Sequence, residues 1–519
     1  MHRPESDEAL QRARRRMAFE EFFVLELAMA LRRRHLLDRF EGRRLPASLE
    51  IDRRIRARFP FQLTDDQNRA IREIATDLDS GRPMTRLLQG DVGSGKTVVA
   101  LYACLLAVAH KRQAAIMAPT EILAAQHFRS IETYLAGSRV RRTLLRGKLG
   151  RKARGEALAA IEAGEIDLVV GTQALLERDV AFRDLALVVV DEQHKFGVLQ
   201  RVEFRTKGPQ PHCLVMTATP IPRTLAMTVF GDLDVSVIES SPPGRGSVST
   251  FVVAPRQWAS VMRRVREKIE AGEQAYVVCP LIGDADGSGD DPAGGSRDAA
   301  SKSDAGGVAE AADKPRAKLA SAIEVYERLT QGPWRGLKIG LLHGALPPEE
   351  KQRVIQAFAA GELQAIVSTT VVEVGVDVPN ASIMVIENAD RFGLSQLHQL
   401  RGRIGRGSRD ATCVLIARSR GAKARERLET LARETNGFRI AEADLRLRGP
   451  GELLGTRQSG LPELRFGDLV QDFELLESAR RDAFALVGQD PHLKRPEHAG
   501  LRLELQRMFR GRLALLDAG

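Results

Sequence analysis

Short apolar runs alternate with longer amphipathic stretches through most of the chain. Five such runs lie between Leu87 and about Ser240, and each ends in small or polar residues: TRLLQG, QAAIMAP, IDLVVGT, LALVVVDE and HCLVMTATP. Apolar runs separated by helical stretches are typical of parallel strands whose crossover helices cover the sheet. Ligands of such sheets gather at the carboxyl ends of the strands. The pattern therefore predicts an α/β lobe with a site along that edge.

The alternation resumes after the Pro/Gly-rich stretch SSPPGRG, with the runs QAYVVCP, LKIGLLHG, LQAIVSTT, ASIMVIEN and ATCVLIA. We therefore expect two α/β lobes with parallel sheets, joined by this linker. Upstream, apolar residues recur largely at helical spacing, which predicts a helix over residues 6–40. Arg clusters at 14–16 and 32–34 flank this helix. They suit either contact with nucleic acid or a solvated helix face.

Residues 283–318 interrupt the alternation. They are dominated by Gly, Ala, Ser and Asp and contain no aromatic residue, which predicts a disordered insertion. The predicted organisation is a helical segment over 1–50, a first lobe over 51–240, a second lobe over 241–418 that holds the insertion, and a carboxy-terminal region over 419–519.

Composition narrows the class of protein only slightly. The 519 residues exceed a single compact core, and the net charge of +10 favours a polyanionic partner weakly. The four cysteines, Cys104, Cys213, Cys279 and Cys413, form no CxxC pair, so neither a zinc site nor a disulfide framework is indicated. No apolar run approaches the ~18 residues of a membrane span, and the first residues do not resemble a signal peptide. A cytoplasmic protein with no membrane partner is expected.

The stretch GDVGSGKT, Gly90 to Thr97, matches the pattern G-x-x-x-x-G-K-[ST] between a predicted strand and a predicted helix. Glycines in such a loop let backbone N–H groups face phosphate oxygens. Lys96 would reach the outer phosphates, and the Thr97 hydroxyl would coordinate Mg²⁺. ATP and Mg²⁺ are thus the expected cofactors, and the candidate nucleotide-binding residues of this stretch are Gly90, Gly93, Ser94, Gly95, Lys96 and Thr97.

Five polar residues, DEQHK, follow the apolar run LALVVV. A nucleotide on the glycine-rich loop needs a carboxylate at a neighbouring strand end to hold Mg²⁺, and Asp191 stands at such a position. Glu192 would orient and polarise the attacking water, and His194 would sense the γ-phosphate. A strand that simply leaves the core for solvent is the plain alternative, and the presence of both motifs in one lobe argues against it.

A series of short stretches along the chain, in order, resembles the motifs of superfamily 2 helicases. The resemblance implies two tandem RecA-like lobes and assigns roles to residues of the first. Gln67 in QLTDDQ would contact adenine, and Thr120 in APTEILAAQH and Thr172 in VVGTQAL would hold a nucleic-acid backbone. Thr217 and Thr219 in MTATP would link hydrolysis to movement.

The resemblance also assigns roles in the second lobe. STTVVEVGVDVP contains Thr369, on the nucleic-acid side, and Gly375 and Asp377, on the nucleotide side. In QLRGRIGR, Arg403 and Arg406 would cross to the γ-phosphate and stabilise transition-state charge. Hydrolysis would then depend on closure of the lobes.

DEQHKFGVLQR and the stretch from Gly437 to Leu469 resemble the RecG family, bacterial DNA translocases that act on stalled forks and Holliday junctions. In that family a helical hairpin and a following loop convert lobe closure into movement along duplex DNA. The candidate coupling residues are Arg446, Arg448, Arg457 and Gln458. An ordinary glycine-rich loop with solvated arginines is the alternative.

The resemblance extends from about Glu8 onward. Family members carry an amino-terminal wedge domain that splits a branch point, and the helix near residues 8–40 resembles the segment that joins wedge to motor. The chain is therefore expected to be either a fragment or a member without the wedge.

The expected function is ATP-driven movement along duplex or branched DNA, in recombination and repair. Contacts mainly to phosphates would make binding sensitive to salt and largely independent of sequence. A monomer in the bacterial cytoplasm is expected, with single-stranded DNA-binding protein as an additional partner. Three alternatives remain: the motor half of a transcription-repair coupling factor, an ATP-gated DNA clamp that does not travel, and a metabolic P-loop kinase. Two lobes and paired arginines argue against the kinase.

Overall fold

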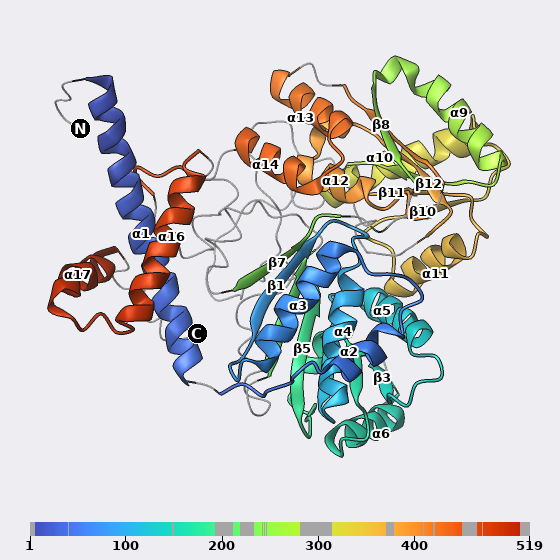
Figure 1. Ribbon diagram of the computed structural model, residues 1–519. Helices are drawn as coiled ribbons and strands as arrows, with labels where there is room; N and C mark the ends of the chain where they lie inside the picture. The colour runs from blue at the N-terminus through green and yellow to red at the C-terminus, as the bar shows by residue number, and fades with distance from the viewer. Residues whose placement is uncertain are drawn as a thin grey trace, which may run out of the picture. The chain divides into compact units, whose positions relative to one another are not determined.

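The computed structural model divides into two compact units (Figure 1). Unit 1 combines Met1–Pro243 with Glu434–Gly519, and unit 2 is Gly244–Arg433. Unit 2 is thus inserted, in sequence, between the two parts of unit 1. The structure describes residues 6–39, 41–147, 150–191, 211–217, 233–240, 242, 244, 246–280, 314–369, 378–407, 409–418, 421–448, 464–469 and 471–508.

Seven strands form the parallel sheet of unit 1, in the spatial order β3-β4-β2-β5-β6-β1-β7. Every residue of β2, β4 and β5 is buried, as expected for strands covered on both faces. The apolar runs predicted β1, β2, β4, β5 and β6, but not the edge strands β3 and β7. In chain order the strands are β1 (Thr85–Gly90), β2 (Gln113–Met117), β3 (Arg142–Leu145), β4 (Leu168–Gly171), β5 (Leu185–Asp191), β6 (His212–Thr217) and β7 (Asp234–Ile238).

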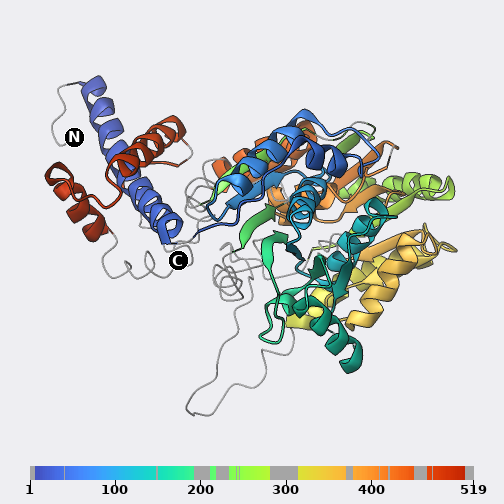
Figure 2. The same ribbon diagram turned by 60° about the horizontal axis from the view of Figure 1, so that its bottom comes forward.

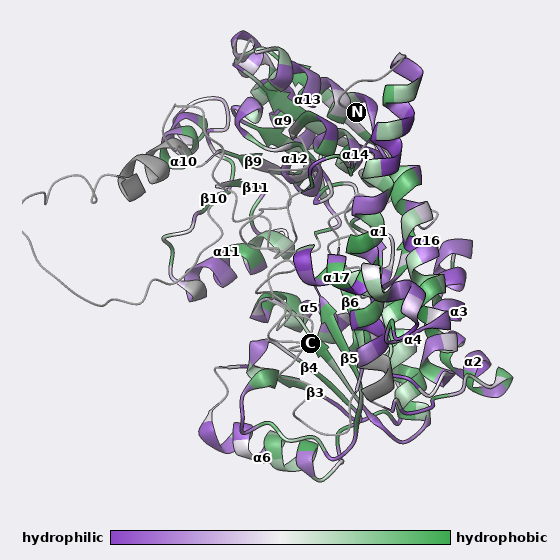
Figure 3. Cartoon of the chain, turned by 90° about the vertical axis from the view of Figure 1, so that its left-hand side faces the viewer, coloured by the Kyte–Doolittle hydropathy of each residue, from purple (hydrophilic) through white to green (hydrophobic). Residues whose placement is uncertain are grey.

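Helices cover this sheet, and Figure 3 shows that apolar residues concentrate in its strands. The helix α4 is buried along its whole middle, from Val98 to Ala107, because it packs against β2 and against α2 and α3. A helix that is apolar on all sides is stable only in such an interior position. The helices of this part are α2 (Leu49–Arg56), α3 (Asp65–Asp79), α4 (Lys96–Ala109), α5 (Glu121–Tyr134), α6 (Arg151–Glu162) and the 3₁₀ turn η1 (Gln173–Leu176).

A second group of helices in unit 1 joins the two ends of the chain. The long α1 (Asp7–Arg39) confirms the helix predicted over 6–40, and it runs beside α16 (Figures 1 and 2). Inside this pair, the fully buried carboxylate of Glu26 accepts a hydrogen bond from Arg480 at 2.9 Å. Burial raises the pKa of Glu26 to about 7, against the opposing effect of Arg480. The other helices here are α14 (Gly437–Arg448), α16 (Phe473–Gln489), η6 (Pro496–His498) and α17 (Ala499–Met508).

Unit 2 contains a six-stranded parallel sheet in the order β10-β11-β9-β12-β13-β8. Its core includes the fully buried Trp334, whose indole Nε1 donates to the Met262 carbonyl at 2.9 Å. The strands are β8 (Val248–Val253), β9 (Gln274–Val278), β10 (Ile339–Leu342), β11 (Ala365–Ser368), β12 (Ala381–Ile386) and β13 (Ala411–Ile416). The helices are η3 (Pro255–Gln257), α9 (Trp258–Glu270), α10 (Lys314–Gln331), α11 (Pro348–Ala359), η5 (Ala389–Arg391), α12 (Leu394–Arg401) and α13 (Ala422–Arg433).

The observed boundaries differ from the predicted ones in two places. The helix α13 belongs to unit 2, since it packs against β8, so the carboxy-terminal part of unit 1 starts at Glu434 and not at residue 419. The helix α10 begins at Lys314, inside the predicted insertion 283–318. Pro315 is tolerated in the first turn of a helix, and the Ala and Lys residues that follow favour helix. Residues 283–313 lie outside the described residues.

Three further features of the described residues concern the cysteines, possible metal ligands and the hydrophobicity of the helices. All four cysteines are free, and Cys213 alone among them is only partly buried. No three His, Cys, Asp or Glu side chains among the described residues are grouped to hold a metal ion by themselves. None of the helices that the structure describes is both long and apolar enough to cross a bilayer.

Candidate nucleotide site and coupling region

The glycine-rich loop between β1 and α4 contains two positions whose backbone angles favour glycine. Gly93 and Gly95 have φ angles of 80° and 84°, in the left-handed region. A Cβ atom on Gly95 would lie 2.2 Å from Nε2 of Gln67, and one on Gly90 would lie 2.5 Å from Oγ of Ser94. The backbone angle thus favours glycine at positions 93 and 95, and the close contacts favour it at positions 90 and 95.

Lys96 is the first residue of α4, and its side chain folds back over the loop. Its Nζ donates to the carbonyl of Gly90 at 2.7 Å and to that of Asp91 at 2.9 Å. The buried Oγ of Ser94 has no hydrogen-bond partner within the described ranges. The ammonium group, an unsatisfied hydroxyl and the N–H groups at the start of α4 suit the oxygens of a phosphate chain. The half-buried Thr97 follows directly.

Gln67 braces this loop from α3. Its Nε2 donates to the carbonyl of Ser94 at 2.9 Å, and its Oε1 accepts from the backbone N–H of Thr64 at 3.0 Å. The second bond is half of a capping box that starts α3. Both ends of the amide are thus used inside the protein. Adenine contact by Gln67 stays a prediction.

Asp191 is the last residue of β5, and its side chain is held by a histidine. The distance from His127 Nε2 to Asp191 Oδ2 is 2.7 Å, and both side chains are nearly buried. His127 lies on α5, seven residues after Thr120, which accepts a hydrogen bond from Leu123 N and caps that helix. Sequence reasoning missed this histidine, although it closes the motif APTEILAAQH. The structure therefore links the predicted Mg²⁺ ligand directly to a helix that starts at a predicted nucleic-acid contact.

The predicted threonines of unit 1 share one edge of the sheet. Thr120 follows β2, Thr172 follows β4, and the buried Thr217 ends β6. Strands of a parallel sheet end at the same edge, so these residues stand on the same side as the glycine-rich loop and Asp191. Thr172 caps η1, with its Oγ1 3.5 Å from Ala174 N. The carboxyl edge of the sheet thus holds those predicted site residues of unit 1 that follow described strands, and their roles stay predictions.

In unit 2, Arg403 and Arg406 lie in the turn after α12 and are half-buried. Arg406 Nε donates to the Gly402 carbonyl at 3.3 Å. The neighbouring Arg401 is structural, since its Nη1 donates to the Leu431 carbonyl at 2.6 Å and ties α12 to α13. Thr369 follows β11, and its buried Oγ1 has no hydrogen-bond partner in the part of the chain that the structure describes.

Unit 2 also carries a strand-end acid, Glu387, which directly follows β12. The Trp258 indole donates to its carboxylate, and Arg328 lies 3.4 Å from the same oxygen and 3.8 Å from the centre of the Trp258 ring. Burial raises the pKa of Glu387, although the Trp258 hydrogen bond and Arg328 oppose the rise. The Glu387 carboxylate is thus bound by side chains of unit 2 itself.

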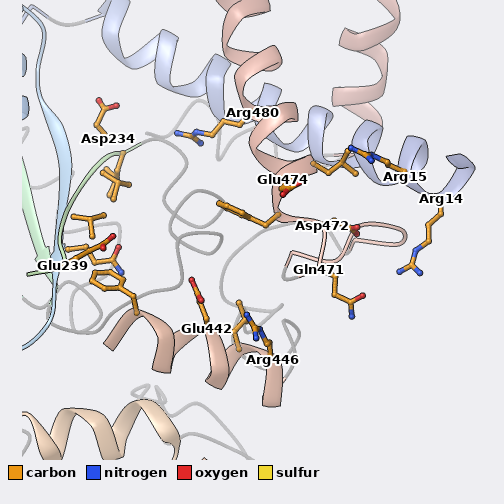
Figure 4. Close-up of a pocket in the computed structure, with 18 of the residues that line it drawn as sticks. Arg14, Arg15, Asp234, Glu239, Glu442, Arg446, Gln471, Asp472, Glu474 and Arg480 are labelled. Carbon is orange, nitrogen blue, oxygen red and sulfur yellow. The ribbon is translucent and has the colours of Figure 1, made fainter. Parts of the chain in front are cut away.

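The part of unit 1 that holds the predicted coupling residue Arg446 borders a hollow of about 1470 Å³ (Figure 4). Arg446 of α14 lines it together with Arg14 and Arg15 of α1. Acidic residues line it as well, among them Asp234, Glu239, Glu442, Asp472 and Glu474. With both signs of charge on its wall, the hollow is not a uniformly basic groove for a polyanion. The arginine cluster at residues 14–16 of α1 thus borders a surface of mixed charge. Such a surface is neither a purely basic contact for nucleic acid nor a plain solvated helix face.

Comparison with known proteins adds the family. Residues 64–228 match the model for DEAD/DEAH box helicases, and residues 316–408 match the helicase conserved C-terminal domain. Residues 434–514 match the model for domain 3, C-terminal, of the ATP-dependent DNA helicase RecG. The ATP-dependent DNA helicase RecG of Bacillus subtilis (strain 168) is 45% identical over 508 residues, which cover 97% of this chain and 70% of that protein. The chain belongs to the RecG family.

Further comparisons agree with this membership. RecG of Synechocystis is 43% identical over 98% of this chain and 58% of its own length. The solved structure of RecG bound to a three-way DNA junction matches with a TM-score of 0.72 and 41% identity, over 91% of this chain and 58% of that one. The predicted RecG resemblance and the tandem RecA-like fold are thereby confirmed. The chain spans 58–70% of the lengths of these relatives.

Several predicted residues of the RecG family site lie outside the described residues. They are Glu192, His194, Thr219, Gly375, Asp377, Arg457 and Gln458. Arg448 ends α14, but its side chain is not described. The roles assigned to all of these residues stay predictions.

Proposed function

We propose that this chain is the ATP-driven motor of a RecG-type helicase, which moves on duplex or branched DNA and remodels stalled forks and Holliday junctions in recombination and repair. The observation that carries the proposal is a glycine-rich loop whose backbone angles and close contacts suit phosphate binding, in the same unit as the region that matches RecG domain 3. A relative solved on a three-way junction supports a branched substrate.

In this proposal the start of α4 and Lys96 bind the phosphates of ATP. Thr97 and Asp191 would hold Mg²⁺, whose charge would neutralise the phosphate oxygens. His127 keeps the Asp191 carboxylate in place, and Glu192 orients and polarises the attacking water. Arg403 and Arg406 stabilise the charge that develops on the γ-phosphate, so hydrolysis requires both units.

Movement uses a different set of residues. The strand-end threonines hold the DNA backbone, and Arg446, Arg448, Arg457 and Gln458 transmit the ATP-driven change to the DNA. Phosphate contacts make the grip sensitive to salt and nearly independent of sequence. A monomeric state and single-stranded DNA-binding protein as a partner complete the proposal.

The test measures ATP hydrolysis and displacement of the third strand from a DNA triplex, with and without DNA branches. A motor hydrolyses ATP in response to DNA and displaces the strand. Stimulated hydrolysis without displacement would instead identify a clamp that does not travel. Hydrolysis that ignores DNA would point back to a P-loop enzyme of metabolism.

A further inference from the structure

One carboxylate on α1 binds three successive backbone N–H groups from a segment more than 400 residues away. Glu21 accepts from Arg465 N at 2.7 Å, from Phe466 N at 2.9 Å and from Gly467 N at 3.0 Å. Three donors aimed at one anion form a concave backbone site, and bonds to an ionised acceptor are stronger than neutral ones. The conformation of residues 465–467 is therefore matched to Glu21.

A second observation shows how closely the two segments fit. A Cβ atom on Gly467 would lie 2.5 Å from the ring of Phe22, the residue after Glu21, which is fully buried. Leu464, Phe466 and Leu469 join Phe22 in one apolar cluster. The segment 464–469 is thus seated on α1 by polar and apolar contacts at the same point.

The contact between residues 464–469 and α1 lies directly after the predicted coupling residues in the sequence. The seated segment begins directly after residues 449–463, which include Arg457 and Gln458, and α14 with Arg446 precedes those residues. After this segment, α16 runs along α1, and the buried Glu26 of α1 pairs with the partly buried Arg480 of α16. The downstream end of the coupling stretch is therefore fixed to α1 at Glu21.

We infer that Glu21 is a positioning residue for translocation: it anchors the coupling region to α1, so that an ATP-driven displacement is delivered to DNA. This inference rests on the proposed function. A push delivered through a stretch of chain moves DNA only if the far end of that stretch is held. With a free end, the stretch absorbs the displacement, while ATP hydrolysis needs only the phosphate site and the arginines.

The test uses Glu21→Gln, which keeps the size of the side chain but replaces one acceptor oxygen with a donor. The matched control is Glu20→Gln, because Glu20 is exposed on the same helix and, within the described ranges, pairs locally with Arg16 at 2.7 Å. Hydrogen exchange of the 465–467 amides reports release of the seat, and triplex displacement per ATP hydrolysed reports coupling. We expect faster exchange, DNA-dependent ATPase within about twofold of the parent chain and displacement lowered roughly tenfold.

Gly467→Ala tests the same seat from the other side, since its Cβ would push against Phe22, and it should give the same uncoupling. If ATPase and displacement fell in equal proportion in both variants, Glu21 would only maintain the fold, and the inference would be wrong. Released amides with unchanged displacement would overturn it as well. A parent chain that never displaces a strand would instead overturn the proposed function, so the two failures are distinguishable.

Discussion

The two sheets of the molecule repeat one strand order and use it differently. Numbered from the start of its own unit, each sheet runs third, fourth, second, fifth, sixth, first; unit 1 adds β7 beyond its first strand. After β1 comes the glycine-rich loop with Lys96, whereas after the equivalent β8 comes Pro255 in the turn η3. Proline and a side chain at each position leave no cradle of N–H groups for phosphate.

The fifth strands make the same contrast with acids. Asp191 at the end of β5 meets His127, while Glu387 after β12 is braced by Trp258 and Arg328. The same position in one fold thus holds a candidate Mg²⁺ ligand in unit 1 and an acid bound by side chains of its own unit in unit 2. Strand order places a strand-end acid, but the neighbouring helices decide what that acid does.

The largest difference between the units should follow replacement of Lys96, the side chain proposed to bind the phosphates of ATP. Lys96→Ala should lower DNA-dependent ATPase by more than about 100-fold, because charge on the phosphates loses its partner. The matched change in unit 2 is Arg256→Ala, in the exposed turn after β8, and it should leave the rate unchanged. Steady-state ATPase of both purified variants checks this. Substantial turnover in Lys96→Ala would show that the working loop lies elsewhere.

A second contrast compares two glycines with positive φ. Gly95→Ala should weaken nucleotide binding by about tenfold or more, because its Cβ would clash with Gln67 and the backbone angle is strained by ~1–2 kcal/mol. Gly361 in unit 2 has a φ of 79° with open space around it, so Gly361→Ala should cost only about 1 kcal/mol of unfolding free energy. Nucleotide titration and urea unfolding separate the two effects. Weakened nucleotide binding in Gly361→Ala would contradict the contrast.

The histidine at Asp191 should tune the metal and not the fold. His127→Ala should raise the Mg²⁺ concentration for half-maximal nucleotide binding by about tenfold, as is typical when a group that orients a metal ligand is lost. Titration of Mg²⁺ against binding of a fluorescent nucleotide measures the shift. Trp258→Phe, the matching loss at Glu387, should leave that concentration where it was. A shift in both variants would mean that the effect is not local.

The smallest effect concerns stability alone. Trp258→Phe removes the donor to Glu387 and should lower the unfolding free energy by about 1–3 kcal/mol at pH 8. Burial raises the pKa of Glu387, so protonation of this carboxyl stabilises the folded state, and that contribution is lost as pH rises through the raised pKa. The Trp258 hydrogen bond opposes the rise in pKa, because it favours the ionised carboxylate that is present at high pH. The penalty should therefore be smaller at pH 5. Urea unfolding at both pH values decides, and a penalty independent of pH would exclude Glu387 as its origin.

The sequence predicted what burial imposes on neighbouring residues and missed what depends on distant ones. Central strands such as β5 are apolar throughout, so they were found, whereas β3, β7 and β8 lie at sheet edges, are only partly buried and were missed. The loop at Lys96 was found because its chemistry is local. His127 contacts Asp191, 64 residues away, and Glu21 contacts Phe466, 445 residues away. The periodicity of apolar residues cannot predict contacts between such distant positions.

The seam between α1 and α16 has a consequence for how the protein is made. Arg480 leaves the ribosome 454 residues after its partner Glu26, which at typical synthesis rates is a delay of roughly 20–90 s. A helix forms in about a microsecond. The apolar side of α1 therefore stays uncovered while the residues between α1 and α16 are synthesised, and both sheets can fold in that interval. Nascent chains should bind chaperones at α1, and a stop codon placed before α16 should release an aggregation-prone product.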